Sequence, residues 1–97
     1  MNETIQITAI LTAKEGQKEA LRTELERARD ASVEEEGNLG YALYESSVEN
    51  AFVLLETYKD EEALNAHINS DHYRSYRENT NDLLANREVH KLTLVEG

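Results

Sequence analysis

Apolar and polar residues alternate along residues 4–12, TIQITAILT. A period of two residues is typical of a β-strand that buries one side. Residues 39–46, 51–59 and 88–95 show similar strand patterns, and the short turn SVEN joins the second strand to the third. The sequence therefore predicts four strands, of which the middle two form a hairpin. The apolar face of the first strand holds Ile5, Ile7, Ala9 and Leu11.

Elsewhere the apolar period changes to three and four residues, which predicts helices. Residues 17–35 form the first helix, and Gly37 is well placed to end it. Asp60 is a suitable N-cap for a second helix, and Ser70 can cap a further segment, so we expect a kink near residues 69–71. The apolar face of the first helix holds Leu21, Leu25, Ala28 and Ser32, and that of the last segment holds Tyr73, Tyr76, Thr80, Leu83 and Leu84.

The predicted order is β-α-β-β-α-β in a single domain of residues 1–97. This is an α+β, ferredoxin-like arrangement: a four-stranded antiparallel sheet with its helices on one face. The third strand carries large apolar residues on both sides, such as Leu54 and Leu55, so its uncovered side should not face water. We therefore expect a homodimer packed sheet to sheet. The alternative is a monomer with a few exposed apolar residues.

Composition excludes several classes of function. The chain has 10 Lys and Arg against 20 Asp and Glu, a net charge of −10, so it offers no basic surface for nucleic acid or an anionic membrane. The absence of Cys excludes disulfides and thiolate chemistry. The first ten residues, MNETIQITAI, have no basic cluster and no long apolar run. We expect neither a signal peptide nor a transmembrane helix, and a cytoplasmic location.

A longer motif spans residues 56–73, E-x-Y-x-D-x-x-A-L-x-x-H-x-x-S-x-H-Y. It resembles the signature of antibiotic biosynthesis monooxygenase (ABM) domains. Residues 35–46, EEGNLGYALYES, are similar to the E-x-G-x-x-x-Y pattern at the family's second strand, and AKEGQKEAL (13–21) is similar to its first turn and helix. The resemblance implies a dimeric α+β barrel with a pocket between sheet and helices. Family members include cofactor-free oxygenases, isomerases that process autoinducers, and haem-degrading oxygenases.

His67 is the principal candidate for catalysis. It lies three residues after Leu64 and next to Ile68, so it should point inward from its helix. A neutral imidazole in an apolar pocket could deprotonate a phenol or an enol, and oxygen could then react with the anion without a metal or flavin. The alternative is a structural histidine bonded to a neighbour. Glu56, a carboxylate on an apolar strand face, needs a partner: it could orient His67 or bind an Arg of a second subunit.

His72 is expected to bond locally near the kink or to border the pocket mouth. Its spacing of five from His67 is not the i, i+4 arrangement that places two ligands on one helix face. A third ligand would have to come from Glu56 or His90, and nothing in the spacing indicates that. The sequence therefore predicts no metal site.

Tyrosines suit a flat, partly polar substrate, because the ring stacks and the hydroxyl finds a partner. Tyr58 and Tyr73 are expected to frame the substrate. The remaining predicted pocket residues are Leu54, Leu64, His72, Tyr44 and Tyr76. Polyketide-oxidising members commonly carry Trp at the place of Tyr58, and some carry Asn and Tyr at the places of Leu54 and Leu64. Haem-degrading members need an Asn and a His where this chain has Ala9 and Arg77, which argues against haem.

The expected function is a cofactor-independent monooxygenase that uses molecular oxygen on a quinol or a small aromatic, polyketide-like substrate. One alternative is an isomerase or degrader of a small signalling molecule. If that molecule is phosphorylated, its pocket needs a basic group, for which Arg74 and Arg77 are nearest in sequence. Another alternative is a non-enzymatic binding or stress-related dimer. A pocket too small for any ligand would favour it.

Overall fold

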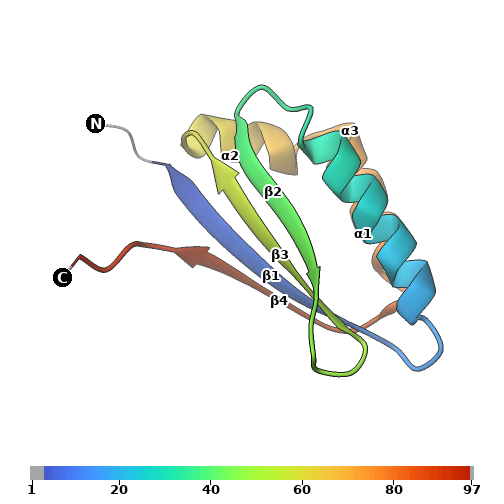
Figure 1. The fold of residues 1–97 in the computed structure, drawn as a ribbon. Coiled ribbons are helices and arrows are strands. Elements are labelled where there is room, and N and C mark those ends of the chain that lie inside the picture. Colours follow the sequence, from blue (N-terminus) through green and yellow to red (C-terminus); the bar gives the residue numbers. More distant parts are fainter. Residues whose placement is uncertain (1–3, 97) are drawn as a thin grey trace.

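Four strands form one antiparallel sheet in the computed structural model, which describes residues 4–96. The strands are Ile5–Ala13 (β1), Asn38–Glu45 (β2), Ala51–Tyr58 (β3) and Leu84–Leu92 (β4), in the spatial order β2-β3-β1-β4. The helices are Lys18–Ser32 (α1), Glu61–Ile68 (α2) and Asp71–Thr80 (α3), and all three lie on one face of the sheet (Figure 1). The predicted α+β, ferredoxin-like fold is confirmed; residues 1–3 and 97 of the predicted domain lie outside the described part.

The first helix packs a narrow stripe against the sheet. Its buried residues are the four that the period predicts: Leu21, Leu25, Ala28 and Ser32. Leu21 and Leu25 are fully buried among Leu11 and Phe52 of the sheet, and each such burial contributes roughly 1.5–3 kcal/mol. The helix ends at Ser32, not at residue 35, because the next residues form tight turns. The prediction that Gly37 ends this helix is therefore wrong.

Two side-chain caps divide the second helical region. Asp60 accepts a hydrogen bond from the Ala63 backbone N–H at 2.8 Å and begins α2. The Ser70 hydroxyl accepts from the Tyr73 N–H at 3.2 Å and donates to the His67 carbonyl at 2.7 Å. The predicted break is confirmed as a join between two separate helices. It places His67 in the last turn of α2 close to the first turn of α3.

The last strand begins earlier than the sequence pattern indicates. The predicted strand was 88–95, but β4 pairs with β1 from Leu84, opposite Ala13, to Leu92, opposite Gln6. Leu83 and Leu84 do not belong to the last helix, because α3 ends at Thr80, whose hydroxyl donates to the Tyr76 carbonyl at 2.7 Å. The long partner strand β1 thus determines where β4 begins. As a result, residues 87 and 89 lie on the helix-covered face.

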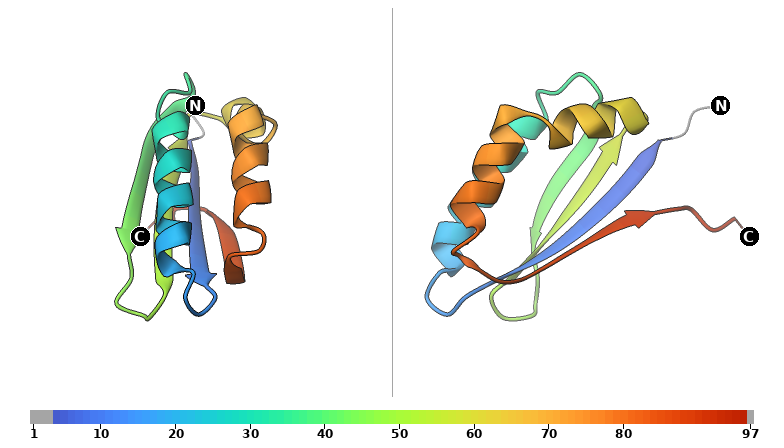
Figure 2. Two further views of the ribbon diagram at one scale, coloured as in Figure 1. Left: turned by 90° about the vertical axis from the view of Figure 1, so that its right-hand side faces the viewer. Right: turned by 180° about the vertical axis from the view of Figure 1, so that it is seen from behind.

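The opposite face of the sheet has no helix over it within residues 4–96, as Figure 2 shows. Tyr44 and Leu55 on this face are 54% and 39% exposed, beside the half-buried Ile10 and Val53. The expectation that the helices leave one apolar side uncovered is confirmed. In the same described range, no helix has the length and apolar character needed to cross a lipid bilayer.

Candidate functional site

A cavity of about 90 Å³ lies between the sheet and helices α2 and α3. Six of the nine predicted site residues line it: Leu54, Glu56, Leu64, His67, Tyr73 and Tyr76. Residues from β1, β2 and β4 complete the wall, with Ile7, Ala9, Tyr41, Arg87 and Val89, and Ile68 closes it from α2. The pocket therefore forms where the sequence pattern places it, but its polar groups are arranged differently from the prediction.

Three predicted residues do not line this cavity. Tyr58 is fully buried beneath it and donates its hydroxyl hydrogen to Glu56 Oε1 at 2.8 Å. His72 lies beside it, bound to Glu35. Tyr44 lies on the uncovered face of the sheet, so its assignment to the pocket is wrong. Alternation along β2 turns Tyr41 inward instead, because the two side chains are three positions apart.

His67 is 4% exposed and occupies the centre of the site. Its ring lies between the rings of Tyr58 and Tyr73, each with a centroid 5.0 Å away. Its Nδ1 is 2.8 Å from Oε2 of Glu35. An ionised carboxylate only accepts hydrogen bonds, so we assign the proton of the neutral ring to Nδ1. The lone pair then lies on Nε2, where it is available to take a proton.

The carboxylate that binds His67 is that of Glu35, in the turn after α1. The same Oε2 is 2.5 Å from Nε2 of His72. Glu56 bonds to Tyr58 instead, so the prediction that Glu56 orients His67 is wrong. Glu35 also supplies the third ligand-type group that the sequence did not place: its oxygen and the two imidazole nitrogens lie within 4.8 Å of one another. His90 pairs with Glu88 on the exposed surface.

Sequence reasoning missed Glu35 as a site residue although the E-x-G-x-x-x-Y motif contains it. All three fixed residues of that motif contact the site or its frame. Glu35 binds both histidines, and Tyr41 lines the cavity. Gly37 lies so close to α2 that a Cβ there would be 2.3 Å from the Cβ of Ala63. The motif was therefore a signal for the site as well as for the family.

Arg87 on β4 is the second missed residue. Its Nη2 donates to the Tyr73 hydroxyl at 3.1 Å, and its buried Nε has no hydrogen-bond partner within residues 4–96. Neither arginine considered from the sequence lines the cavity: Arg74 pairs with Asp71 on the surface, and the exposed Arg77 packs over the Tyr73 ring and donates to its hydroxyl at 3.2 Å. The basic group of the pocket is therefore Arg87.

Burial sets the protonation of the other polar groups. Burial raises the pKa of the Glu56 carboxyl above its usual range, although the hydrogen bond from Tyr58 opposes that rise. Burial likewise raises the pKa values of the Tyr41, Tyr58 and Tyr76 phenols. These phenols therefore remain hydrogen-bond donors at neutral pH. The site thus combines one candidate proton acceptor, His67, with a carboxyl group that retains its proton to a higher pH than usual.

Comparison with known proteins shows the family of the chain. Residues 4–79 match the antibiotic biosynthesis monooxygenase family. The chain is 33% identical over 82 residues to "Putative monooxygenase YcnE" of Bacillus subtilis, covering 84% of this chain and 86% of that protein. It is 32% identical over 84 residues to "Putative monooxygenase Rv0793" of Mycobacterium tuberculosis, covering 87% and 83%.

Solved structures give the same result. The structure of Rv0793 has a TM-score of 0.91 at 29% identity and covers 98% of each chain. The crystal structure of PA3566 from Pseudomonas aeruginosa has a TM-score of 0.89 at 29% identity, covering 96% of this chain and 95% of that one. By motif, sequence identity and fold, this chain belongs to the antibiotic biosynthesis monooxygenase family.

Proposed function

We propose that the chain is a cofactor-independent monooxygenase that acts on a quinol or a small aromatic, polyketide-like substrate. The hydrogen bond of 2.8 Å between His67 Nδ1 and Glu35 carries this proposal. It holds the ring in one orientation and leaves Nε2 as a base beside the cavity that His67 lines. Glu35 thus takes the orienting role that the sequence analysis gave to Glu56.

The reaction requires only the substrate and oxygen. His67 removes a proton from a phenol or an enol, and the resulting anion transfers an electron to O₂. A carbon–oxygen bond then forms between the two radicals, and the peroxide loses water, so that a CH₂ group becomes C=O and the second oxygen atom leaves in water. The substrate supplies every electron, and no external reductant is consumed. Arg87 Nε, an unpartnered donor among the described residues, supports this role because it could stabilise the anionic oxygen.

Glu56 is proposed to act as the second proton carrier. Its pKa is raised by burial, and its Oε1 accepts from the Tyr58 hydroxyl, so the carboxyl is held in one position at the cavity wall. A carboxyl that still carries a proton can donate it to the leaving oxygen of the peroxide. Tyr58 and Tyr73 frame the ring of His67, and Leu54 and Leu64 supply apolar walls.

The size of the cavity favours a second candidate function. Its volume of about 90 Å³ is smaller than the roughly 150 Å³ that accommodates benzene in an engineered core. A substrate ring therefore enters only after rim side chains move, and Ile68, 45% exposed, is the most accessible of them. The second candidate is a non-enzymatic protein whose tyrosines simply fill its interior. A small, closed cavity is what this candidate predicts. Arg74 and Arg77 are exposed, so a phosphorylated signal would have to bind Arg87, the arginine that lines the cavity.

Oxygen uptake distinguishes the two candidates. Chelator-treated protein is mixed with a panel of quinols and anthrone-like ketones in an oxygen electrode, and products are analysed after reaction under ¹⁸O₂. We expect one O₂ consumed per substrate, one labelled oxygen atom in the product, and no hydrogen peroxide. If members of the panel raise the melting temperature of the protein but none consumes oxygen, the non-enzymatic function is correct instead.

We also propose that the functional form is a homodimer packed through the uncovered sheet face. The exposed Tyr44 and Leu55 support it, because burying them removes apolar area from water. Sedimentation should give twice the chain mass of 11.1 kDa. Leu55→Asp should give the single-chain mass, and Val48→Asp, an exposed site in the turn before β3, should not. A wild-type chain that sediments as a monomer would exclude this interface.

A further inference from the structure

We propose that Glu35, His67 and His72 form a binding site for a divalent transition-metal ion, with Zn²⁺ as the representative ion. Glu35 Oε2, His67 Nδ1 and His72 Nε2 all lie within 4.8 Å of one another. Two imidazole nitrogens and one carboxylate oxygen are a donor set that Zn²⁺ accepts in sites whose fourth position is left to water or a ligand. The prediction of no metal site was based on the spacing of the two histidines and on the lack of a third ligand. The break between α2 and α3 brings the two histidines together, and Glu35 supplies the third ligand.

Only small movements separate the present arrangement from a coordination sphere. Bonds of about 2.0–2.2 Å place tetrahedral donors roughly 3.3–3.5 Å apart. Glu35 Oε2 is now 2.8 Å from His67 Nδ1 and 2.5 Å from His72 Nε2. The oxygen therefore has to withdraw by about 1 Å or less, and the two imidazole nitrogens, which lie within 4.8 Å of each other, have to reach the same donor spacing. The Glu35 side chain can make this movement, since it extends from a turn and is 17% exposed.

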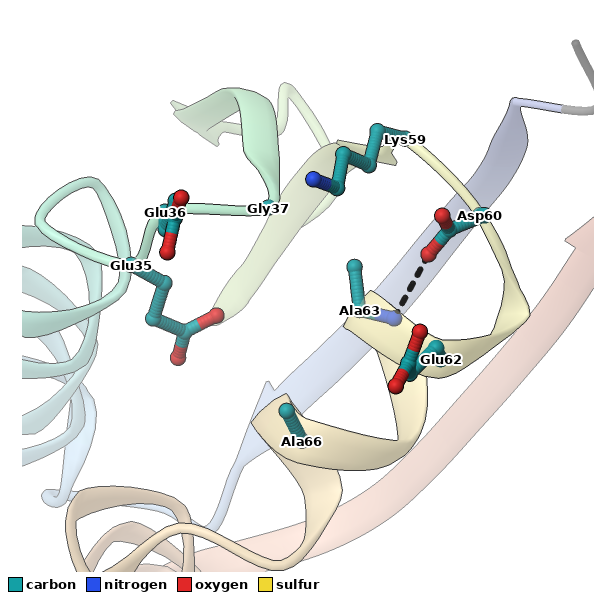
Figure 3. A pocket seen from close by; sticks show the side chains of 8 residues that line it. All are labelled: Glu35, Glu36, Gly37, Lys59, Asp60, Glu62, Ala63 and Ala66. Atoms are coloured by element: carbon teal, nitrogen blue, oxygen red, sulfur yellow. Dashed lines mark hydrogen bonds between the residues drawn. The ribbon is translucent and has the colours of Figure 1, made fainter.

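The depression beside the site provides an approach for a cation. Glu35 also lines a second pocket of about 330 Å³, whose other charged groups are Glu36, Lys59, Asp60 and Glu62. Figure 3 shows these side chains surrounding the pocket. Four carboxylates against one ammonium group give it a local charge of −3. A cleft lined by one sign of charge raises the local concentration of the opposite ion.

The partial exposure of the ligands also suits an exchangeable ion. His67 is buried, whereas the His72 side chain is 32% exposed. One side of the cluster is therefore fixed by the core, and the other can open to admit the ion. The cluster also offers one carboxylate beside two imidazole ligands, and the carboxylate partly neutralises a bound divalent ion.

Metal binding has a direct consequence for His67. In the hydrogen-bonded form, the ring proton is on Nδ1 and the lone pair is on Nε2. An ion takes the lone pair of Nδ1, so the proton of the neutral ring is then on Nε2. Nε2 can no longer accept a proton, and the ion is an inhibitor rather than a cofactor. The binding is independent of the proposed function, and only the inhibition rests on it.

Calorimetry with Zn²⁺ tests the binding. The probe is added to tag-free, chelator-treated full chain in millimolar Mg²⁺, which occupies the surface carboxylates because Mg²⁺ prefers oxygen ligands. We expect one Zn²⁺ per chain and a raised melting temperature. His72→Gln and Glu35→Gln should each raise Kd by about tenfold or more, since each removes one of three ligands. His90→Gln is the matched control, because His90 is the third histidine of the chain and lies on the sheet face opposite the cluster.

Two results would overturn the site. One is no saturable Zn²⁺ binding to the wild-type chain under these conditions. The other is an equal loss of affinity in His72→Gln and His90→Gln, which would place the ion on the surface. Co²⁺ provides a second readout, because ligation by two imidazoles should give visible absorption bands that His72→Gln changes and His90→Gln does not. A chain that binds Zn²⁺ with one-to-one stoichiometry but oxidises no substrate would support the site and contradict only the proposed oxygenase.

Discussion

His67→Asn should lower kcat by about 10²–10⁴-fold, the usual contribution of a general base. The side-chain amide of asparagine can place an N–H near the position of Nδ1, so the bond to Glu35 can persist while the base at Nε2 is lost. Because the substitution removes proton transfer and little contact area, kcat should fall much more than KM changes. The measurement is steady-state oxygen uptake on whichever substrate the panel identifies.

His90→Asn is the control for this substitution. It makes the same chemical change on the sheet face opposite the pocket, where its side chain bonds to Glu88, so it should retain wild-type turnover once sedimentation shows that its mass is unchanged. Circular dichroism and the melting temperature should show that His67→Asn is folded. Full activity in a folded His67→Asn variant would exclude His67 as the base, and an equal fall in both variants would indicate a general effect of losing histidine.

Gly37→Ala should lower the free energy of unfolding by about 1–3 kcal/mol, because its new methyl group overpacks a contact with no space. A Cβ at this position would be 2.3 Å from the Cβ of Ala63 and 3.3 Å from its Cα. The turn is also fixed to β3, since the Lys59 N–H donates to the Gly37 carbonyl at 2.9 Å. Relief of the clash therefore requires α2 to move outward. That movement separates His67 from Glu35, so the substitution should also reduce oxygen uptake.

Urea unfolding measures the effect, and a double-mutant cycle assigns its cause. Ala63→Gly removes the clashing methyl group at a cost of about 1 kcal/mol in the helix. Gly37→Ala combined with Ala63→Gly should therefore be about as stable as Ala63→Gly alone. Gly40→Ala is the matched control, because a Cβ there would only touch Thr57 at an ordinary 3.9 Å. If Gly37→Ala costs no more than Gly40→Ala, the close approach of the turn to α2 does not limit stability.

Local patterns were sufficient to predict most of the fold. The strand period predicted the sheet, the Leu21 and Leu25 spacing predicted the buried face of α1, and the caps at Asp60 and Ser70 predicted the break between α2 and α3. These features depend on neighbours in the sequence. The six correctly placed pocket residues follow for the same reason, since each lies on a predicted buried face.

The pairing of charged groups could not be predicted in this way. Glu35 was assigned to a helix that ends three residues earlier, at Ser32, so the helical period could not place its side chain. Arg87 lay just outside the predicted last strand, and it reaches the pocket because β4 pairs with β1 from Leu84 onward. Both errors concern contacts between distant segments, which no local periodicity records.

The single oxygen of Glu35 that two imidazoles share also bears on the order of folding. It binds His67 in α2, which lies 32 positions further along the chain, and His72 in α3, which lies 37 positions further along. Closing such loops costs chain entropy before any contact compensates for it. The cluster also requires the turn after α1 and both helices α2 and α3 to be in place, so substitutions there should accelerate unfolding more than they slow folding. In kinetic terms, the site holds the finished fold together and contributes little to starting it.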